Sequence, residues 1–255
     1  MKGRQNRMNK KHHFFGLLSR MRLIKRWSLM RNLNSENIAE HSYDVAIIAH
    51  NLAWLRKLRF ADQYSCCPDP GKVMQLAVFH DAPEIITGDL PTPVKYYDQN
   101  LRQSFACLEE QAIARLISLL PLDLQPIYAD LLRPDRATQE INQALLLVKA
   151  ADKLSAYLKC LQETQQGNSE FAPALATTLA AIHALKLPEA ECFLTEFAPS
   201  YVLPLDELQP VAETAEGQAT VQAKGQPKGQ PTVQPREQPA AQPINLVKDN
   251  CNDHQ

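Results

Sequence analysis

The sequence predicts an all-α protein, a helical bundle followed by a disordered tail, and three patterns carry that prediction. Between residues 14 and 197, apolar residues recur at offsets of three and four, which is the spacing of one helix face. No segment alternates apolar and polar residues with the period of two that indicates a half-buried strand. From about residue 209 the composition changes, and a Gln-Pro pair recurs every four residues between Gln226 and Pro243.

Turn-forming residues separate the expected helices. Segments with helical spacing cover residues 14–24, 38–55, 72–82, 101–120, 124–132, 138–163, 173–185 and 188–197. Ser35 is the expected N-cap of the second helix, because its hydroxyl can accept a hydrogen bond from the first turn. Pro83 disfavours helical geometry at Ala82, so we expect a kink or a helix end there. Gly and Pro predict loops at residues 63–71 and 88–93.

Composition divides the 255 residues into three segments. Residues 1–12 form a basic, polar leader that lacks the apolar core of a secretory signal; its scarcity of Ser makes a transit peptide the weaker alternative. Residues 13–208 hold the periodic helices and form the folded domain. Residues 209–255 contain few large apolar side chains. Burial therefore cannot offset the entropy of ordering them, and we expect a disordered Gln/Pro-rich tail.

Charge and composition narrow the class of partner. The net charge is −1, so the molecule as a whole does not attract a nucleic-acid polymer, although a local cationic pocket could still bind a small anion. No apolar run approaches the ~20 residues needed to cross a bilayer. The six cysteines show no CxxC spacing, which favours reduced thiols in the cytosol. We therefore expect a cytoplasmic protein that binds neither a membrane nor a nucleic-acid polymer.

Four ionisable side chains interrupt otherwise apolar helical segments: His41, His80, Asp81 and Asp152. Burying an unpaired carboxylate is costly unless it is paired or bound to a metal. One explanation is structural, with Arg26 pairing to Asp152 across the fold. The other is that three helices bring two imidazoles and two carboxylates to one divalent metal ion. That donor set suits such an ion and leaves positions open for water and substrate.

Glu84 lies four residues after His80, a spacing that places both on one face of a continuous helix. A carboxylate beside a metal site can orient the attacking water or carry its proton. The simpler interpretation is a solvent-facing charge at a helix start, where the helix dipole favours it. Because Pro83 can redirect the chain, the sequence leaves both interpretations open.

The H…HD…D order of the four side chains resembles that of the HD-domain phosphohydrolases. Longer sequence motifs narrow the resemblance to the bacterial 5′-deoxynucleotidases of the YfbR type. These motifs are RWSLMRN at residues 26–32, EHS at 40–42, HDAPE at 80–84, TGDLPTPVKY at 87–96 and AYLKCL at 156–161. The resemblance covers residues 12–207. The tail lies outside it.

The resemblance implies an HD-domain helical bundle that acts as a cytoplasmic homodimer. It implies hydrolysis of deoxyribonucleoside 5′-monophosphates to deoxynucleoside and phosphate, with one divalent ion, cobalt or manganese, supplying the attacking water. The implied metal ligands are His41, His80, Asp81 and Asp152. The implied catalytic residues are Glu84, Asp81 and Arg26. The implied substrate-binding residues are Arg26, Trp27, Asp81, Asp89, Leu90, Pro91, Thr92 and Asp152.

Two other functions share these motifs. A hydrolase of another phosphoester, such as a ribonucleotide, a cyclic nucleotide or a polyphosphate, would use the same metal ligands. A catalytically silent nucleotide-binding protein on the same fold is the second, and the intact ionisable residues argue against it. The sequence contains no GxxxxGK[ST], HExxH or GxSxG motif, which makes other common hydrolase sites the weaker interpretation.

Overall fold

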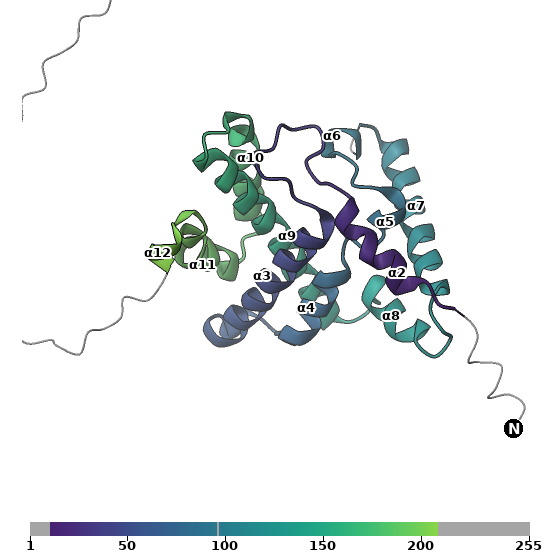
Figure 1. The fold of residues 1–255 in the computed structure, drawn as a ribbon. Helices are drawn as coiled ribbons and strands as arrows, with labels where there is room; N and C mark the ends of the chain where they lie inside the picture. The colour runs from purple at the N-terminus through teal and green to yellow at the C-terminus, as the bar shows by residue number, and fades with distance from the viewer. Residues whose placement is uncertain (1–10, 96, 209–255) are drawn as a thin grey trace, which may run out of the picture. The chain divides into compact units, whose positions relative to one another are not determined.

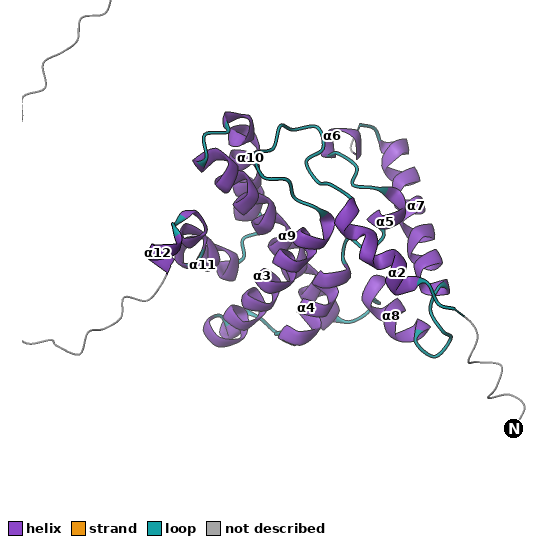
Figure 2. Cartoon of the chain, viewed as in Figure 1, coloured by secondary structure: helices purple, strands orange, loops and turns teal. Residues whose placement is uncertain are grey.

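The computed structural model describes residues 11–95 and 97–208, and Figure 1 shows these residues as a bundle of helices. Figure 2 shows helices joined by loops, and the isolated bridge between Lys25 and Asn37 is the sole β-type pairing in the described ranges. The predicted all-α bundle is confirmed. The expected tail at residues 209–255 and the leader up to residue 10 lie outside the described residues.

The helical elements follow one another closely along the chain. In order they are α2 (Phe14–Leu18), η1 (Ser19–Leu23), α3 (Ile38–Arg59), η2 (Ala61–Gln63), α4 (Pro70–Phe79), α5 (Glu84–Thr87), α6 (Thr92–Lys95), α7 (Gln99–Ser118), α8 (Gln125–Leu132), α9 (Gln139–Gln165), η3 (Ser169–Phe171), α10 (Ala172–His183), α11 (Pro188–Glu196), η4 (Ala198–Val202) and α12 (Leu205–Leu208). Within the described ranges, none of these helices combines the length and apolarity needed to cross a bilayer.

Helix α3 begins at Ile38, the start of the predicted segment, but its N-cap is Asn37 and not Ser35. The Asn37 side chain accepts hydrogen bonds from the N–H groups of Ala39 and Glu40, and the Glu40 carboxylate accepts one from the Asn37 N–H. This reciprocal pair is a capping box. The chain before it is extended and bonded to another segment, with the Ile38 N–H donating to Ile24 O over 3.0 Å. Helical geometry therefore starts at Ile38.

Proline and glycine set the ends of the short helices near the site. Helix α4 ends at Phe79, three residues earlier than expected, and a turn leads through Pro83 into α5. Gly88, with φ of +74°, ends α5 in a backbone conformation that residues other than glycine rarely adopt. The predicted loop at residues 88–93 is correct only as far as Pro91, because α6 begins at Thr92.

The main core lies where α3, α4 and α9 pack together. Its fully buried members include Val45, Leu52, Leu76, Leu147 and Leu154. Each side chain of this size stabilises the fold by about 1.5–3 kcal/mol when it is buried. A second cluster joins α2 to α7 and α8. The same three helices that form the main core carry or precede the predicted metal ligands, so core packing fixes the relative positions of those ligands.

Candidate metal centre

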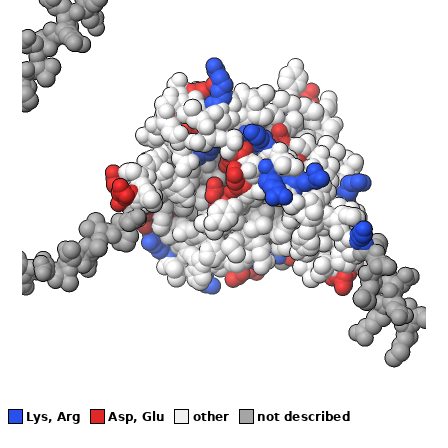
Figure 3. All heavy atoms as spheres, viewed as in Figure 1, with Lys and Arg blue, Asp and Glu red and all other residues white. Residues whose placement is uncertain are grey.

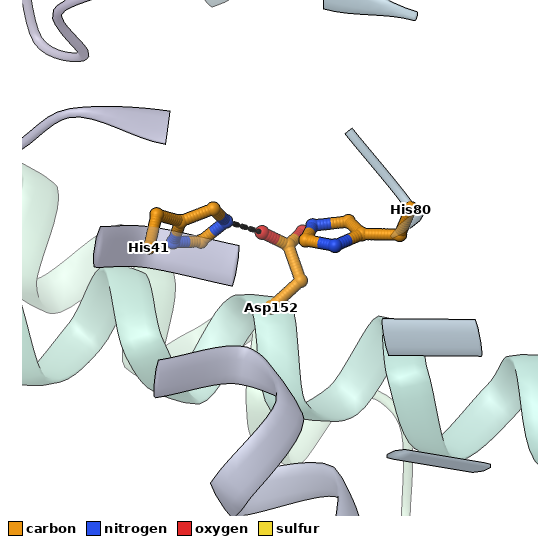
Figure 4. A group of neighbouring side chains, drawn as sticks. All are labelled: His41, His80 and Asp152. Atoms are coloured by element: carbon orange, nitrogen blue, oxygen red, sulfur yellow. Dashed lines mark ion pairs between the residues drawn. The ribbon is translucent and has the colours of Figure 1, made fainter. Parts of the chain in front are cut away.

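The structure brings His41, His80 and Asp152 together from three different helices. His41 lies in the first turns of α3, His80 is the C-cap of α4, and Asp152 lies near the middle of α9. One ligand atom from each residue lies within 4.8 Å of the other two. Figure 4 shows the two imidazole rings on either side of the Asp152 carboxylate, with the His41 ring nitrogen 3.2 Å from Oδ1. Such a group can hold a metal ion.

Asp81 adds a second carboxylate to this group. Its Oδ2 lies 3.1 Å from His80 Nε2 and 3.5 Å from His41 Nε2. Asp81 follows the C-cap of α4 and lies in the turn before α5, so the end of α4 directs it toward α3. The four side chains that the sequence singled out as metal ligands are therefore neighbours in space.

Both histidines present Nε2 to the centre of the group. His80 Nδ1 lies 2.6 Å from the carbonyl oxygen of Ala77, which can only accept a hydrogen bond, so Nδ1 carries the proton. His41 Nδ1 lies 3.1 Å from Ser155 Oγ. The two Nε2 atoms are buried and have no hydrogen-bond partner, an unusual state for a buried polar atom. Ligand histidines are held in this way by a partner on the other nitrogen, so the residues fit a divalent ion.

Charge also favours a cation at this position. Burial lowers the pKa of His80, but the neighbouring Asp81 carboxylate raises it by a larger amount, so that the pKa is about 9. Burial raises the pKa of Asp81, and the His80 imidazolium lowers it well below its usual range. Burial raises the pKa of Asp152, but the adjacent His41 ring, whose Nε2 lies 3.2 Å from Oδ1, lowers it below its usual value. The two ionised carboxylates thus stabilise the positive charge of the His80 ring. A divalent ion bound at Nε2 can replace the proton that this nitrogen carries in the imidazolium.

Glu84 borders the group at the start of α5. Its Oε2 is buried without a hydrogen-bond partner, so the interpretation as a solvent-facing charge is wrong for this oxygen. Burial raises the pKa of Glu84 to about 9, and the negative charges of Asp81 and Asp89 contribute to the increase. A carboxyl group with a raised pKa beside a candidate metal centre is typical of a group that transfers protons.

Arg26 lies beside the metal group, and its ion pair is with Glu36 and not with Asp152. The two side-chain atoms, Arg26 Nη1 and Glu36 Oε2, are 3.6 Å apart. Nη1 is buried and makes no hydrogen bond, although the positive charge of Arg26 lowers the pKa values of Asp81, Glu84 and Asp89. A guanidinium with an unused N–H next to this group can donate a hydrogen bond to a phosphate oxygen.

Trp27 has the left-handed backbone conformation, with φ of +58°, which is rare for a bulky residue. Its indole N–H donates a hydrogen bond to Glu36 Oε2 over 2.9 Å, and the centroids of its ring and the Phe171 ring are 5.5 Å apart. Asn32 donates a hydrogen bond to the Trp27 carbonyl oxygen. Strain of this kind persists where surrounding contacts fix the conformation, and it is frequent at binding sites.

The segment between α5 and α6 holds the remaining residues for which the resemblance implies a role. Asp89, Leu90 and Pro91 are half-buried loop residues. Burial raises the pKa of Asp89, Arg26 lowers it and Asp81 raises it, so the Asp89 carboxylate lies within electrostatic reach of the group. Thr92 is the first residue of α6. Figure 3 shows acidic and basic side chains side by side near the middle of the viewed face, within a mostly uncharged surface.

Glu36 contacts three of the predicted site residues, although no sequence pattern singled it out. Its carboxylate contacts Arg26, Trp27 and His41, with Oε1 3.7 Å from His41 Nδ1. In the sequence it is an acid just before a helix, a common feature because the helix dipole favours negative charge there. Its contacts depend on pairing between two backbone segments, which no local pattern indicates. Ser155 lies one turn after Asp152 on α9, and its hydrogen bond with His41 was not foreseen from the sequence.

The helical bundle and the H…HD…D group together define an HD-domain phosphohydrolase. A solved structure of an HD-domain phosphohydrolase from Listeria innocua has 28% sequence identity and a TM-score of 0.61, and the match covers 74% of this chain and 88% of that one. The chain belongs to the 5′-deoxynucleotidase YfbR-like family, whose sequence model matches residues 13–201.

Curated relatives match most of the chain and nearly all of their own length. A 5′-deoxynucleotidase of Vibrio parahaemolyticus is 43% identical over 199 residues, which make up 78% of this chain and 99% of the relative. The 5′-deoxynucleotidase YfbR of Escherichia coli is 42% identical over 199 residues, covering 78% of this chain and 96% of the relative.

Proposed function

We propose that the protein is a metal-dependent 5′-deoxynucleotidase that hydrolyses deoxyribonucleoside 5′-monophosphates to deoxynucleoside and phosphate. The observation that carries the proposal is the convergence of two buried imidazole nitrogens that make no hydrogen bond and two ionised carboxylates, beside an arginine whose Nη1 is buried. Phosphate-ester hydrolysis needs an activated water, a group that takes its proton, and positive charge for the phosphate. The relatives from Vibrio and Escherichia are named for this activity.

In this proposal His41, His80, Asp81 and Asp152 hold one divalent ion. When bound, the ion lowers the pKa values of a water molecule and of nearby Glu84, and it neutralises phosphate charge. Imidazole and carboxylate ligands suit cobalt and manganese, which we propose as the native metals. Ser155 and the Ala77 carbonyl hold the two rings in the orientation that presents Nε2.

Arg26 and Glu84 carry the remaining chemistry. Arg26 donates from Nη1 to a phosphate oxygen and orients the phosphorus toward the attacking water. Glu84 accepts the proton of that water through its buried Oε2 and transfers it to the 5′-oxygen as the P–O bond breaks. Asp81, in contact with both histidines, contributes a negative charge that offsets the positive charge of the bound metal ion.

The nucleoside lies between Trp27 and the loop before α6 in this proposal. Trp27 offers a rigid aromatic surface to the nucleotide. Asp89, Leu90, Pro91 and Thr92 contact the sugar. Asp81 and Asp152 lie beside the substrate as well as the metal. A loop that closes on the sugar without a partner for a 2′-hydroxyl disfavours ribose, because that hydroxyl would be buried unsatisfied.

We also propose that residues 13–208 form the catalytic domain and that the enzyme works as a cytoplasmic homodimer. The family match over residues 13–201 supports this domain boundary. Light scattering coupled to gel filtration measures the oligomeric state, and a monomer over the working concentration range would contradict the homodimer. A chain limited to residues 13–208 should keep its activity, with residues 1–12 and 209–255 removed.

Chelation followed by addition of single metals tests the activity. We expect phosphate release from dAMP only after Co²⁺ or Mn²⁺ is restored, and slower release from AMP under the same conditions. A panel with 3′-monophosphates, cyclic nucleotides and polyphosphate measures the breadth of the reaction. Metal-independent release, or equal rates for a cyclic nucleotide and dAMP, would contradict the proposal.

A further inference from the structure

Glu36 lies between the two residues proposed to bind the nucleotide and the helix that carries the first metal ligand. Its Oε2 accepts a hydrogen bond from the Trp27 indole over 2.9 Å and lies 3.6 Å from Arg26 Nη1. Its Oε1 lies 3.7 Å from His41 Nδ1. We infer that Glu36 is a positioning residue that fixes Arg26 and Trp27 for substrate binding, an inference that rests on the proposed function.

The backbone brings Glu36 to this position. The bridge between Lys25 and Asn37 pairs the segment before α3 with the segment that follows η1. The Arg26 N–H donates to the carbonyl oxygen of Glu36 over 3.0 Å. The main chain and the side chain of Glu36 therefore both contact Arg26. The next residue, Asn37, is the N-cap of α3, so Glu36 directly precedes that helix.

Burial gives the Glu36 contacts their strength. Glu36 is only 9% exposed, and a carboxylate at that depth is stable only with charged or hydrogen-bonding partners. Those partners are two residues of the proposed nucleotide site and one of the proposed metal site. The hydrogen bond to Trp27 is shorter than the approach to His41, so the larger effect falls on the nucleotide side.

The conformation of Trp27 needs an external restraint. Its positive φ is unfavourable for a side chain of this size, and the indole is free to rotate about two side-chain bonds unless its N–H is bound. Glu36 supplies that partner on one edge, and Phe171 packs against the ring. Without the carboxylate, Arg26 also loses its ion-pair partner beside the metal group.

Two substitutions separate positioning from simple support of the fold. Glu36→Ala removes both oxygens, whereas Glu36→Gln keeps an oxygen that accepts the Trp27 N–H and removes the charge. Glu40→Gln is the matched control, because Glu40 is exposed in the first turn of α3 and bonds the Asn37 backbone, which Gln can also do. Thermal unfolding shows that each variant is folded at the assay temperature.

Kinetics and metal binding provide the first readout. We expect Glu36→Ala to raise KM for dAMP about tenfold, the effect of losing a charged hydrogen-bonding partner. Glu36→Gln should recover part of that loss, and Mn²⁺ affinity measured by calorimetry should change less than threefold. A KM equal to that of Glu40→Gln would overturn the inference. So would a loss of Mn²⁺ affinity larger than the change in KM, since Glu36 would then act on His41.

Fluorescence gives a second readout that needs no turnover. Trp54 lies about 20 Å further along α3 than His41, so Trp54→Phe leaves Trp27 as the one emitter without touching the site. In that background, we expect Glu36→Ala to shift Trp27 emission and Glu36→Gln to leave it nearly unchanged. Unshifted emission in Glu36→Ala would overturn the inference. If the wild-type protein released no phosphate from dAMP, the proposed function would fail, while this readout would still decide the role of Glu36.

Discussion

Asp152 Oδ1 lies 3.2 Å from His41 Nε2, although the two residues come from helices far apart along the chain. His41 is fully buried, and its Nε2 makes no hydrogen bond. The packing of α3 on α9 therefore places a carboxylate oxygen and an imidazole nitrogen side by side, where a shared cation would satisfy both.

Asp152→Asn tests the contribution of this carboxylate. The amide keeps the shape of the side chain but supplies neither the charge nor the basicity of a carboxylate ligand. We expect Mn²⁺ affinity to fall more than about a hundredfold, with kcat falling in parallel at fixed metal concentration. Calorimetric titration measures the first and phosphate release the second. Asp123→Asn, an exposed site without a described partner in this structure, should change neither. Full activity in Asp152→Asn would contradict the proposed ligand set.

Metal affinity should depend on pH through His80. The pKa of its imidazole is about 9 in the metal-free protein, so below that pH a proton occupies the ring and competes with the metal. The sign follows directly: apparent affinity rises with pH, by up to about tenfold per unit, and levels off near pH 9. Titrations at pH 6.5, 7.5 and 8.5 measure the slope. An affinity independent of pH over this range would be inconsistent with His80 as a ligand.

Glu84→Gln separates proton transfer from metal binding. The amide cannot accept the proton of the attacking water, so kcat should fall by about 10²–10⁴-fold, the usual size of a general acid–base contribution. Mn²⁺ affinity should change much less, because Glu84 is not among the four proposed ligands. Pre-steady-state and steady-state phosphate release, measured at saturating metal, give kcat. A kcat within twofold of the wild type would remove Glu84 from the mechanism.

Glu163 anchors the loop before α3 to α9, and its replacement should destabilise the fold. Its carboxylate accepts hydrogen bonds from the backbone N–H groups of Leu33 and Asn34, at 2.9 and 3.0 Å, and from Lys159. Glu163→Gln should lower the free energy of unfolding by about 2 kcal/mol at pH 7, the effect of losing charged hydrogen bonds. Urea unfolding measures the change. Glu170→Gln, which alters an ion pair with an exposed arginine, should cost less than about 1 kcal/mol.

The cost of Glu163→Gln should depend on pH. Burial raises the pKa of Glu163, but the hydrogen bond from Lys159 and those from the loop lower it to about 2, from a usual value of 4.5. A depressed pKa in the folded state stabilises the fold above pH 4.5, and this stabilisation is lost as pH falls toward 2. The difference between wild type and variant should therefore shrink over that window. A difference that stays constant from pH 5 to pH 3 would contradict this linkage.

Helical spacing predicted the bundle and the neighbourhood of the metal group, because the same apolar faces that define helices also build the core. His41 and Asp152 could be singled out because each places a polar group on such a face. The boundaries were less predictable. Ser35 has the chemistry of an N-cap, but backbone pairing between residues 24–26 and 36–38 keeps it outside the helix. That pairing joins segments separated by a loop and leaves no periodic signal.

The same pairing explains why Glu36 was missed. Its three contacts with Arg26, Trp27 and His41 exist only once the two segments lie side by side. Glu84 was ambiguous for a related reason, since α4 ends at Phe79 and α5 begins as a new helix at Glu84, after Pro83. The burial of its Oε2 follows from that tertiary arrangement and not from its spacing to His80.

Anomalous scattering from crystals grown with Mn²⁺ is the most direct test of whether the four side chains share one ion. We predict a single strong peak, with one atom of each of His41, His80, Asp81 and Asp152 at about 2.0–2.4 Å, the range for imidazole and carboxylate ligands of divalent metals. No peak at this position in a fully metal-loaded crystal, or a peak that fewer than three of these residues approach, would contradict the proposed metal centre.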